Sequence, residues 1–225
     1  MQGWRRHFFY TAQSTRTTWT FRLAVLAVVV LCVMSTRGWW TRWIGQSLVC
    51  ASDAAPSDAL LLENFDPNYL LFERAEALER RGLASWALVP VETSTDPSVP
   101  NAMSRDIAEA MARRSRLPVI RIIPIQHVEP ISLNAAAQIL EYLRRERVRS
   151  VIVVAPGFRS RRSQLVYRAV LGNAGIQVRC EPVFGRTTPE RWTKTWHGIQ
   201  EVVQEFSKLQ YYRLYVLPFR SPVGG

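Results

Sequence analysis

Arginines gather directly after the most apolar strand that the sequence predicts. Ser150–Ala155 is an uninterrupted, mainly β-branched run, and Gly157, Arg159 and Arg162 follow it, the two arginines at the start of a predicted helix. A helix amino terminus attracts anions, and guanidinium groups grip phosphate or carboxylate in a bidentate manner. The pattern favours an anion site here. The alternative interpretation is a solvated basic patch, because the chain uses arginine freely elsewhere.

Carboxylates and a histidine stand after other predicted strands. Glu63 and Asp66 follow the first strand, and paired carboxylates can perform acid–base chemistry where burial separates their pKa values. The other interpretation of Asp66 is a helix cap before Pro67. His127 follows the third strand and could act as a general base, although a lone loop histidine commonly has no catalytic role. Glu63 and His127 are therefore the candidate catalytic residues, with no reaction assigned.

The elements that must position these side chains alternate along the chain. Strands are predicted over residues 58–63, 86–91, 118–124, 150–155 and 176–183, and helices over 67–81, 104–115, 132–147, 159–173 and 190–209. Residues 211–217 either extend the last helix or add an edge strand. This order predicts a doubly wound, mainly parallel, Rossmann-like α/β sheet with helices on both faces. Ligands bind such sheets at the carboxyl ends of the strands. The residues at these ends include Glu63, Asn64, His127, Gly157 and Arg159.

One apolar segment precedes the predicted domain. Leu23–Met34 contains no polar residue, and an arginine stands on each side, at Arg22 and Arg37. The stretch between the arginines is about 14 residues, or roughly 21 Å of helix, which is shorter than the roughly 30 Å of a bilayer core. Snorkelling of the arginines and an interfacial belt of tryptophans can close this gap. The tryptophans are Trp39, Trp40 and Trp43.

We expect this segment to be a membrane anchor, which makes membrane lipid a partner of residues 23–44. A cleaved secretory signal is one alternative, but Arg37 and tryptophans stand where a cleavage site needs small residues. The other alternative is a buried core helix. The polar tail that precedes the segment argues against this interpretation. Basic residues before the segment place the amino terminus in the cytoplasm and the domain outside, although both flanks are basic.

Charge and composition divide the chain into five parts. These are a basic cytoplasmic tail (1–22), an anchor with its aromatic interfacial segment (23–44), a linker (45–57), the α/β domain (58–217) and a short tail (218–225). The formal net charge of +11 attracts polyanions in general. We do not expect nucleic acid among them, because the aromatic residues do not interleave with basic ones as a binding platform requires.

The cysteines and histidines do not have the spacing of metal ligands, so no metal is expected, and no motif implies a cofactor. We interpret Cys32, Cys50 and Cys180 as small apolar residues or free thiols. Pairing of Cys50 with Cys180 would require the linker to fold back beside the last strand.

Several stretches in order carry a family resemblance. Arg74–Leu78 (RAEAL) and Gly82 follow the first strand, Pro130–Ala135 (PISLNA) stands where a family motif reads S-T-x-E-N-A, and Val151–Ser163 stands where another reads L-V-T-S-x-x-H-x-x-R-A. Over residues 57–217 the chain thus resembles the family of YdcF, SanA and ElyC, a bacterial domain of unknown function (number 218). SanA and ElyC likewise carry a short membrane anchor before the domain.

Asn134 and Arg162 match retained motif positions of that family, whereas the motif histidine falls on Arg159 and two motif polar residues fall on Ile131 and Leu133. The family's glycine-rich turn after the first strand is replaced by Glu63 and Asn64, and that after the second by residues 92–94. Glycines in such turns let backbone N–H groups approach an anion. The chain therefore resembles a divergent member of the family.

The resemblance implies a single-pass protein of the bacterial plasma membrane, associated with the cell envelope. Its ligand would be anionic, nucleotide-like or lipid-linked, and the lost glycines favour binding without catalysis. The predicted ligand-binding residues are Asn64, Asn134, Gly157, Arg159 and Arg162. The alternative is an enzyme that acts on a phosphorylated or nucleotide-like envelope precursor, with His127, Asn134 and Arg162 in its pocket. The fold alone does not distinguish a binding protein from an enzyme.

Overall fold

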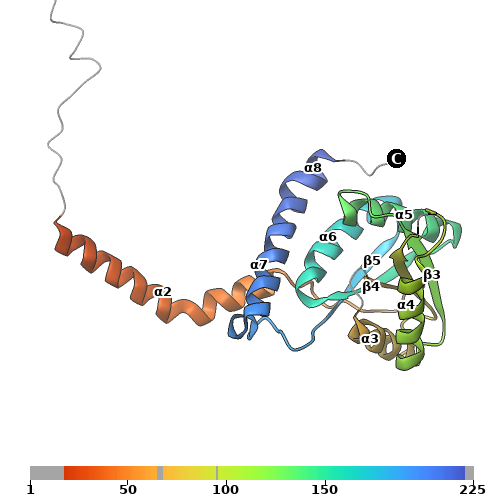
Figure 1. Cartoon of the computed structure of the whole chain (residues 1–225), viewed down its shortest axis with the longest axis horizontal. Helices are drawn as coiled ribbons and strands as arrows, with labels where there is room; N and C mark the ends of the chain where they lie inside the picture. Colours follow the sequence, from red (N-terminus) through yellow and green to blue (C-terminus); the bar gives the residue numbers. More distant parts are fainter. Residues whose placement is uncertain (1–17, 65–67, 95, 221–225) are drawn as a thin grey trace, which may run out of the picture. The chain divides into compact units, whose positions relative to one another are not determined.

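The computed structural model describes residues 18–64, 68–94 and 96–220 of the chain. The chain divides into two compact units, Met1–Trp40 and Thr41–Gly225. Apart from Thr18, the described part of the first unit belongs to helix α2 (Trp19–Ser47), whose last residues fall in the second unit. The second unit contains the α/β domain (Figure 1).

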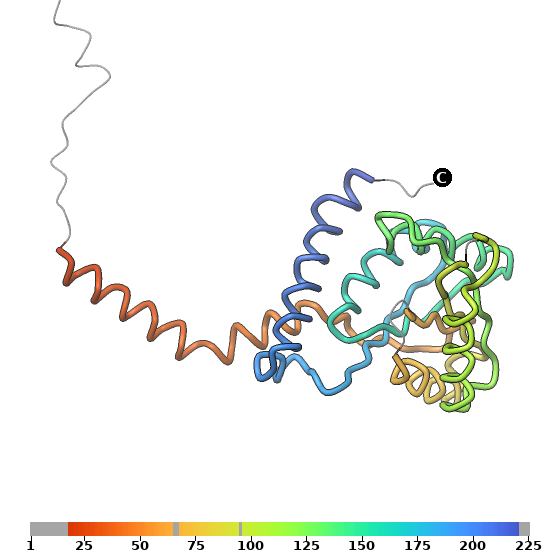
Figure 2. Tube along the Cα trace, in the orientation of Figure 1, coloured from red at the N-terminus to blue at the C-terminus, as the bar shows by residue number. Residues whose placement is uncertain are grey.

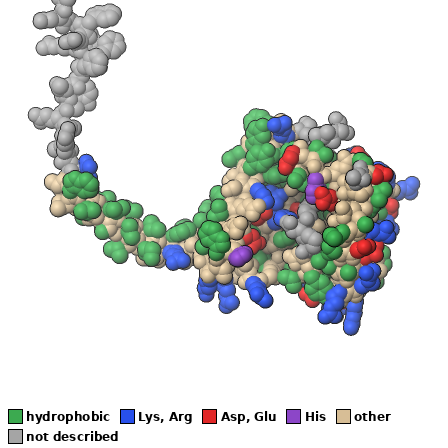
Figure 3. All heavy atoms as spheres, viewed as in Figure 1, with side chains coloured by type: hydrophobic (Ala, Val, Ile, Leu, Met, Phe, Trp, Pro, Cys, Tyr) green, Lys and Arg blue, Asp and Glu red, His purple; other side chains and the backbone are tan. Residues whose placement is uncertain are grey.

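Helix α2 is long and apolar enough to cross a membrane, and it is the one such helix among the described residues. Its 29 residues correspond to about 43 Å, more than the roughly 30 Å of a bilayer core. The apolar side chains of its amino-terminal part are exposed, as Leu26 at 58% and Leu31 at 68% illustrate, and Figure 3 shows them as a nearly continuous hydrophobic covering. The helix is longer than the apolar stretch between Arg22 and Arg37, because it continues through both arginines.

The helix continues past the point where the sequence suggested an end. Ser35 and Thr36 donate their hydroxyl hydrogens to the carbonyl oxygen of Cys32, at 3.0 and 2.7 Å. Such bonds satisfy the hydroxyls inside the helix, so these residues do not need to leave it. Arg37 and the tryptophans after it are therefore helical as well.

The domain has a five-stranded, fully parallel sheet in the order β3-β2-β1-β4-β5. The strands are β1 (Ala59–Leu62), β2 (Ala87–Glu92), β3 (Ile120–Ile125), β4 (Ser150–Pro156) and β5 (Gln177–Val183). Strand β4 lies inside the sheet, between β1 and β5, and Val151–Ala155 is fully buried. Its uninterrupted apolar sequence is explained by this burial on both faces.

Helices cover both faces of the sheet, which confirms the predicted doubly wound architecture (Figure 1). Leu60 and Leu62 of β1 pack with α3 (Tyr69–Arg80) and α4 (Ala102–Ser115). The intervening Leu61 packs on the other face with the remaining helices. Helices α5 (Ile131–Arg145) and α6 (Ser160–Val170) cover this face. The residues that follow α7 (Trp196–Tyr211) also pack here. Short 3₁₀ turns are η1 (Gly157–Arg159), η2 (Gly172–Ala174) and η3 (Trp192–Lys194).

The cap of α3 differs from the sequence interpretation. Asn68 is the N-cap, and its side-chain oxygen accepts a hydrogen bond from the backbone N–H of Leu70 at 3.0 Å. Asp66 and Pro67, which the sequence suggested for this role, lie outside the described residues.

The carboxyl-terminal region extends the last helix instead of adding a strand. Helix α7 continues through a π-helical turn, η4 (Tyr212–Val216), into α8 (Leu217–Phe219), and α6 and α7 lie side by side (Figure 2). The turn directs Tyr212 and Val216 into the core, where both are buried. Burial of these two side chains explains why the segment stays helical.

A disulfide joins Cys50 to Cys180, so our interpretation of these two cysteines as unpaired was wrong. The physical reason is that the linker folds back beside β5. The backbone N–H of Asp53 donates to the carbonyl oxygen of Cys180 at 3.1 Å, and the N–H of Cys50 donates to Ser160 Oγ at 3.0 Å. Cys32 carries a free, exposed thiol.

Candidate functional site

The candidate site lies where the order of the sheet reverses. From β1 the chain proceeds to β2 and β3 on one side, and then crosses to β4 and β5 on the other. A crevice at the carboxyl ends of the strands beside such a reversal is the usual ligand site of open α/β sheets. Glu63 follows β1 at this point, and η1 with Arg159 follows β4.

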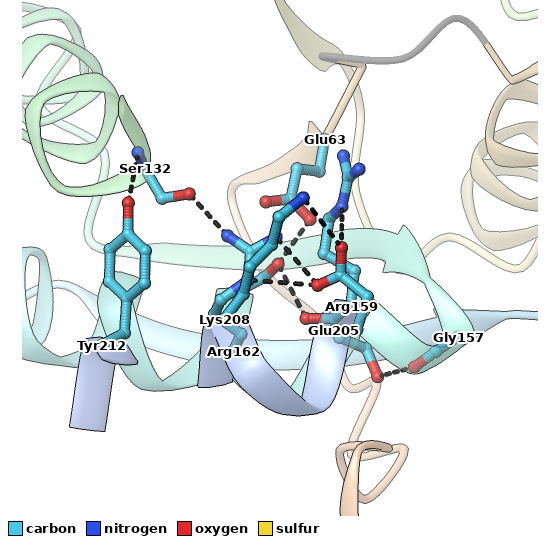
Figure 4. Close-up of polar contacts among 10 residues, drawn as sticks. Glu63, Ser132, Gly157, Arg159, Arg162, Glu205, Lys208 and Tyr212 are labelled. Atoms are coloured by element: carbon cyan, nitrogen blue, oxygen red, sulfur yellow. Dashed lines mark hydrogen bonds and ion pairs between the residues drawn. The ribbon is translucent and has the colours of Figure 1, made fainter. Parts of the chain in front are cut away.

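Three cationic side chains form ion pairs with one buried carboxylate at this crevice (Figure 4). Glu205 of α7 is 6% exposed, and its Oε2 lies 3.0 Å from Arg162 Nη2. Its Oε1 lies 3.7 Å from Arg159 Nε and 3.6 Å from Lys208 Nζ. A buried carboxylate requires such pairing, because an isolated charge is costly away from water. Positive charge nevertheless exceeds negative charge in this cluster.

Arg162 connects three helices and is itself buried. Its Nε and Nη2 donate to Glu205 on α7, its Nη1 donates to Ser132 Oγ on α5 at 2.6 Å, and its guanidinium lies 5.5 Å from the ring centre of Tyr212. The phenol oxygen of Tyr212 in turn accepts a hydrogen bond from the backbone N–H of Ser132 at 3.0 Å. Arg162 therefore positions its neighbours as well as contributing charge.

Arg159 and Lys208 are more open than Arg162, and both line two neighbouring cavities. The first cavity, of about 330 Å³, is lined by Glu63, His127, Glu129, Ile131, Ser132, Arg159, Arg162, Lys208, Tyr211 and Tyr212. The second, of about 350 Å³, is lined by Pro156, Arg159, His197, Gln200, Glu201, Gln204, Glu205 and Lys208. Arg159 and Lys208 are the cations best placed to meet a ligand in either one.

The surroundings of Glu63 favour the protonated form of its carboxyl group. The Ser163 hydroxyl lies within hydrogen-bonding distance of Glu63 Oε2 and of the Arg159 carbonyl oxygen. A hydroxyl has one hydrogen to donate, so both contacts are satisfied when Glu63 is protonated and donates to Ser163 Oγ. Burial raises the pKa of the Glu63 carboxyl above its ordinary value, against the lowering effect of Arg159 and Arg162.

Four of the predicted site residues line the first cavity together: Glu63, His127, Arg159 and Arg162. The other three are placed differently. The side-chain amide of Asn134 donates to the Val128 carbonyl oxygen at 3.1 Å and lines a separate cavity beside β3. Asn64 is buried, and its Oδ1 has no hydrogen-bond partner among the described residues.

Gly157 is required for packing. A Cβ atom at this position would stand 2.2 Å from the ring of Phe184, and the Gly157 carbonyl oxygen accepts a hydrogen bond from Ser160 Oγ at 2.5 Å. Direct ligand contact by Asn64, Asn134 or Gly157 stays a prediction. No group of histidine, cysteine and acidic residues that could hold a metal ion occurs among the described ranges.

Sequence reasoning missed Glu205, Lys208, Ser132 and Tyr212. A signal for Glu205 was present, because it lies three residues after Val202 and four before Leu209, both of which are buried. A carboxylate on the apolar stripe of a helix is expected to have a buried cationic partner. The sequence does not tell which arginine that partner is.

The fold and the site together define a doubly wound α/β domain with a cationic crevice at its strand ends, preceded by a helix that could span a membrane. No model of a known protein family matches the chain, and no curated protein sequence matches it. Membership of the YdcF, SanA and ElyC family thus stays a prediction.

Replacing Glu205 by glutamine should destabilise the domain, because Arg159, Arg162 and Lys208 would lose their shared counter-charge. Breaking a buried ion pair costs about 3 kcal/mol or more, and about 3 kcal/mol corresponds to a melting temperature lower by roughly 6–12 °C in a chain of this size. Thermal melting of the full chain, followed by tryptophan fluorescence in neutral detergent, measures this.

The matched control is Glu141→Gln, since Glu141 pairs with Arg145 at 3.5 Å on the exposed face of α5. Its melting temperature should stay close to that of the unchanged chain. Equal shifts for the two variants would contradict the central role of Glu205.

The raised pKa of Glu63 predicts a specific pH dependence. Because the folded state holds this proton more tightly than the unfolded state, its stabilising contribution is complete below the ordinary pKa of 4.5 and is lost as pH rises through the folded pKa. Glu63→Gln keeps a neutral side chain at every pH. The stability of the variant relative to the unchanged chain should therefore increase from pH 4 toward pH 8 in urea unfolding, and a constant difference would refute a protonated Glu63.

Proposed function

We propose that this chain is a membrane-anchored protein of the cell envelope, whose α/β domain binds an anionic group at the carboxyl ends of its strands. The observation that carries the proposal is the convergence of three cationic side chains on one buried carboxylate, Glu205, beside the reversal of the sheet. The resemblance to the YdcF, SanA and ElyC family suggests the same class of ligand.

The charges at the site favour an anion. Arg159, Arg162 and Lys208 are opposed at close range by Glu205. Burial favours the neutral form of Glu63, which leaves Glu129 as the other acidic residue that lines this cavity. Excess positive charge in a partly buried crevice attracts anions more strongly than the same charge in open water. The guanidinium of Arg159 can bind phosphate in a bidentate manner, and Lys208 can add a point charge.

The disulfide supports the proposed orientation of the anchor. Structural disulfides persist in oxidising compartments outside the cytoplasm and are rare inside it. Cys50 and Cys180 both belong to the second unit, so the domain would fold outside while residues 1–22 remain in the cytoplasm. This agrees with the orientation that the arginines before α2 favour.

An enzyme is the second candidate, and the state of Glu63 favours it. A neutral carboxylic acid that lines a cavity beside arginines can protonate a leaving oxygen as a general acid. The Oε1 atom of Glu63 is buried and has no hydrogen-bond partner among the described residues, so a ligand could supply one. His127 lines the same cavity, with Nδ1 3.8 Å from Glu92 Oε1, and is the nearest candidate for a base.

Changing Arg159 and Lys208 together to glutamine should weaken anion binding at least about tenfold, or about 1.4 kcal/mol. The probes are inorganic phosphate and pyrophosphate, titrated calorimetrically into the full chain in neutral detergent at several salt concentrations. Affinity should fall as salt increases.

The control is Arg113→Gln with Arg114→Gln on the exposed face of α4, which removes the same charge far from the crevice. Retained affinity in the Arg159 and Lys208 variant, or equal loss in the control, would remove the site from consideration.

Alkaline phosphatase fused after Gly225 should be active, because it requires the oxidising exterior, and a fluorescent protein that matures only in the cytoplasm should stay dark there. Fractionation of the same cells should place both fusions in the membrane. The reverse pattern would overturn the orientation, and recovery of the fusions in the soluble fraction would overturn the anchor.

A further inference from the structure

The segment before α7 is fixed to the part of α2 that belongs to the second unit. Trp192 is buried, and its indole N–H donates to the carbonyl oxygen of Thr41 at 2.9 Å. A Cβ atom at Gly45 would stand 3.0 Å from the backbone of Pro189 and 3.1 Å from the Trp192 ring. Pro189 and Trp192 therefore lie against residues 41–45 of α2.

This segment carries a concentrated positive charge. Arg186, Arg191, Lys194 and His197 line a cavity of about 400 Å³ together with two threonines, and no acidic residue lines it. The three cationic side chains form no ion pair with any described carboxylate.

Several exposed arginines of the two helices α4 and α5 have acidic partners. Arg105 and Arg113 both pair with Glu109 along α4, and Arg145 pairs with Glu141 along α5. Exposed cations with acidic partners are the usual form of a solvated face. The one acidic residue of segment 186–197, Glu190, lies 4.0 Å from Arg42 and does not line the cavity. The cavity lined by Arg186, Arg191 and Lys194 is therefore complementary to anions.

An exposed tryptophan accompanies the charge. Trp196 begins α7 and is 71% exposed, directly after the cationic residues. Trp39 and Trp43 near the end of the apolar run are 74% and 61% exposed. Tryptophan favours the interfacial layer of a bilayer, where its ring is apolar and its N–H meets water and headgroups.

We propose that residues 186–197 form a binding site for the headgroup of an anionic phospholipid, with Arg186, Arg191 and Lys194 on the phosphate and Trp196 in the interface. The proposal rests on the proposed membrane anchor. If the anchor leaves the bilayer near Trp39–Trp43, then Trp192, which is bonded to Thr41, lies at the level of the headgroups. Basic residues at this level bind acidic lipid by electrostatic attraction.

The test uses the full chain in neutral detergent, with native mass spectrometry to count bound lipids. The probes are dioctanoyl phosphatidylglycerol, dioctanoyl phosphatidylcholine and glycerol 3-phosphate. Phosphatidylglycerol should bind, and the variant Arg186→Gln, Arg191→Gln, Lys194→Gln should weaken this binding by about tenfold or more. The control variant Arg105→Gln, Arg113→Gln, Arg145→Gln removes equal charge elsewhere and should bind normally.

Equal binding of the two lipids, equal binding of glycerol 3-phosphate, or unchanged binding by the Arg186, Arg191 and Lys194 variant would each overturn the inference. All three residues are exposed, so that variant should keep the melting temperature of the unchanged chain, and Trp196→Ala offers a second, charge-neutral variant that should also weaken lipid binding.

Failure of the proposed function gives other results than failure of the lipid-binding site. A chain that is not anchored appears in the soluble fraction of cells before lipid is added. A strand-end site that binds no anion fails with pyrophosphate, whatever the Arg186, Arg191 and Lys194 variant does with lipid.

Discussion

The carboxylate of Glu205 holds the candidate site together, because cations from three parts of the chain meet it. Arg159 belongs to η1 after β4, Arg162 belongs to α6, and Lys208 lies one turn further along α7. Removing a carboxylate from water is costly, and only close pairing offsets that cost. The pairing thereby determines how α7 packs against the strand ends, and the Ser132 and Tyr212 contacts of Arg162 extend the same constraint to α5 and the π-helical turn.

The protonation of Glu63 determines the net charge of the crevice. An ionised Glu63 would leave its neighbour Ser163 with two acceptors and one hydrogen, and would cancel part of the surrounding positive charge. Burial favours the neutral acid over the attraction of Arg159 and Arg162. In the proposed function, protonation of Glu63 would leave the arginines with more positive charge for an anion and would also supply an acid, so both proposed roles would depend on one equilibrium.

The sequence was sufficient for the architecture and for part of the site. Alternating apolar runs predict the sheet, and the rule for strand ends brings Glu63, His127 and Arg159 to one cavity. The role of Glu205 was not predicted, because its cationic partners depend on how the last helix packs. The pairing of Cys50 was not predicted because it depends on the linker lying beside β5 after the turn at Leu48, a feature without a sequence pattern. Asn134 has the predicted place but turns toward the Val128 carbonyl, which only local geometry decides.

Two cavities lined by cations lie near the two ends of α7, and a third cavity shares lining residues with each of them. His197 lines both the cavity of segment 186–197 and the connecting one, while Arg159 and Lys208 line both the connecting cavity and the one at Glu63. The side chains between the two ends are mostly polar and include Gln200 and Gln204 together with two carboxylates, Glu201 and Glu205. A free anion needs only one of these ends. An anion that remains attached to a lipid needs a polar path from the headgroup layer to the strand ends, and the row of cavities along α7 has this form.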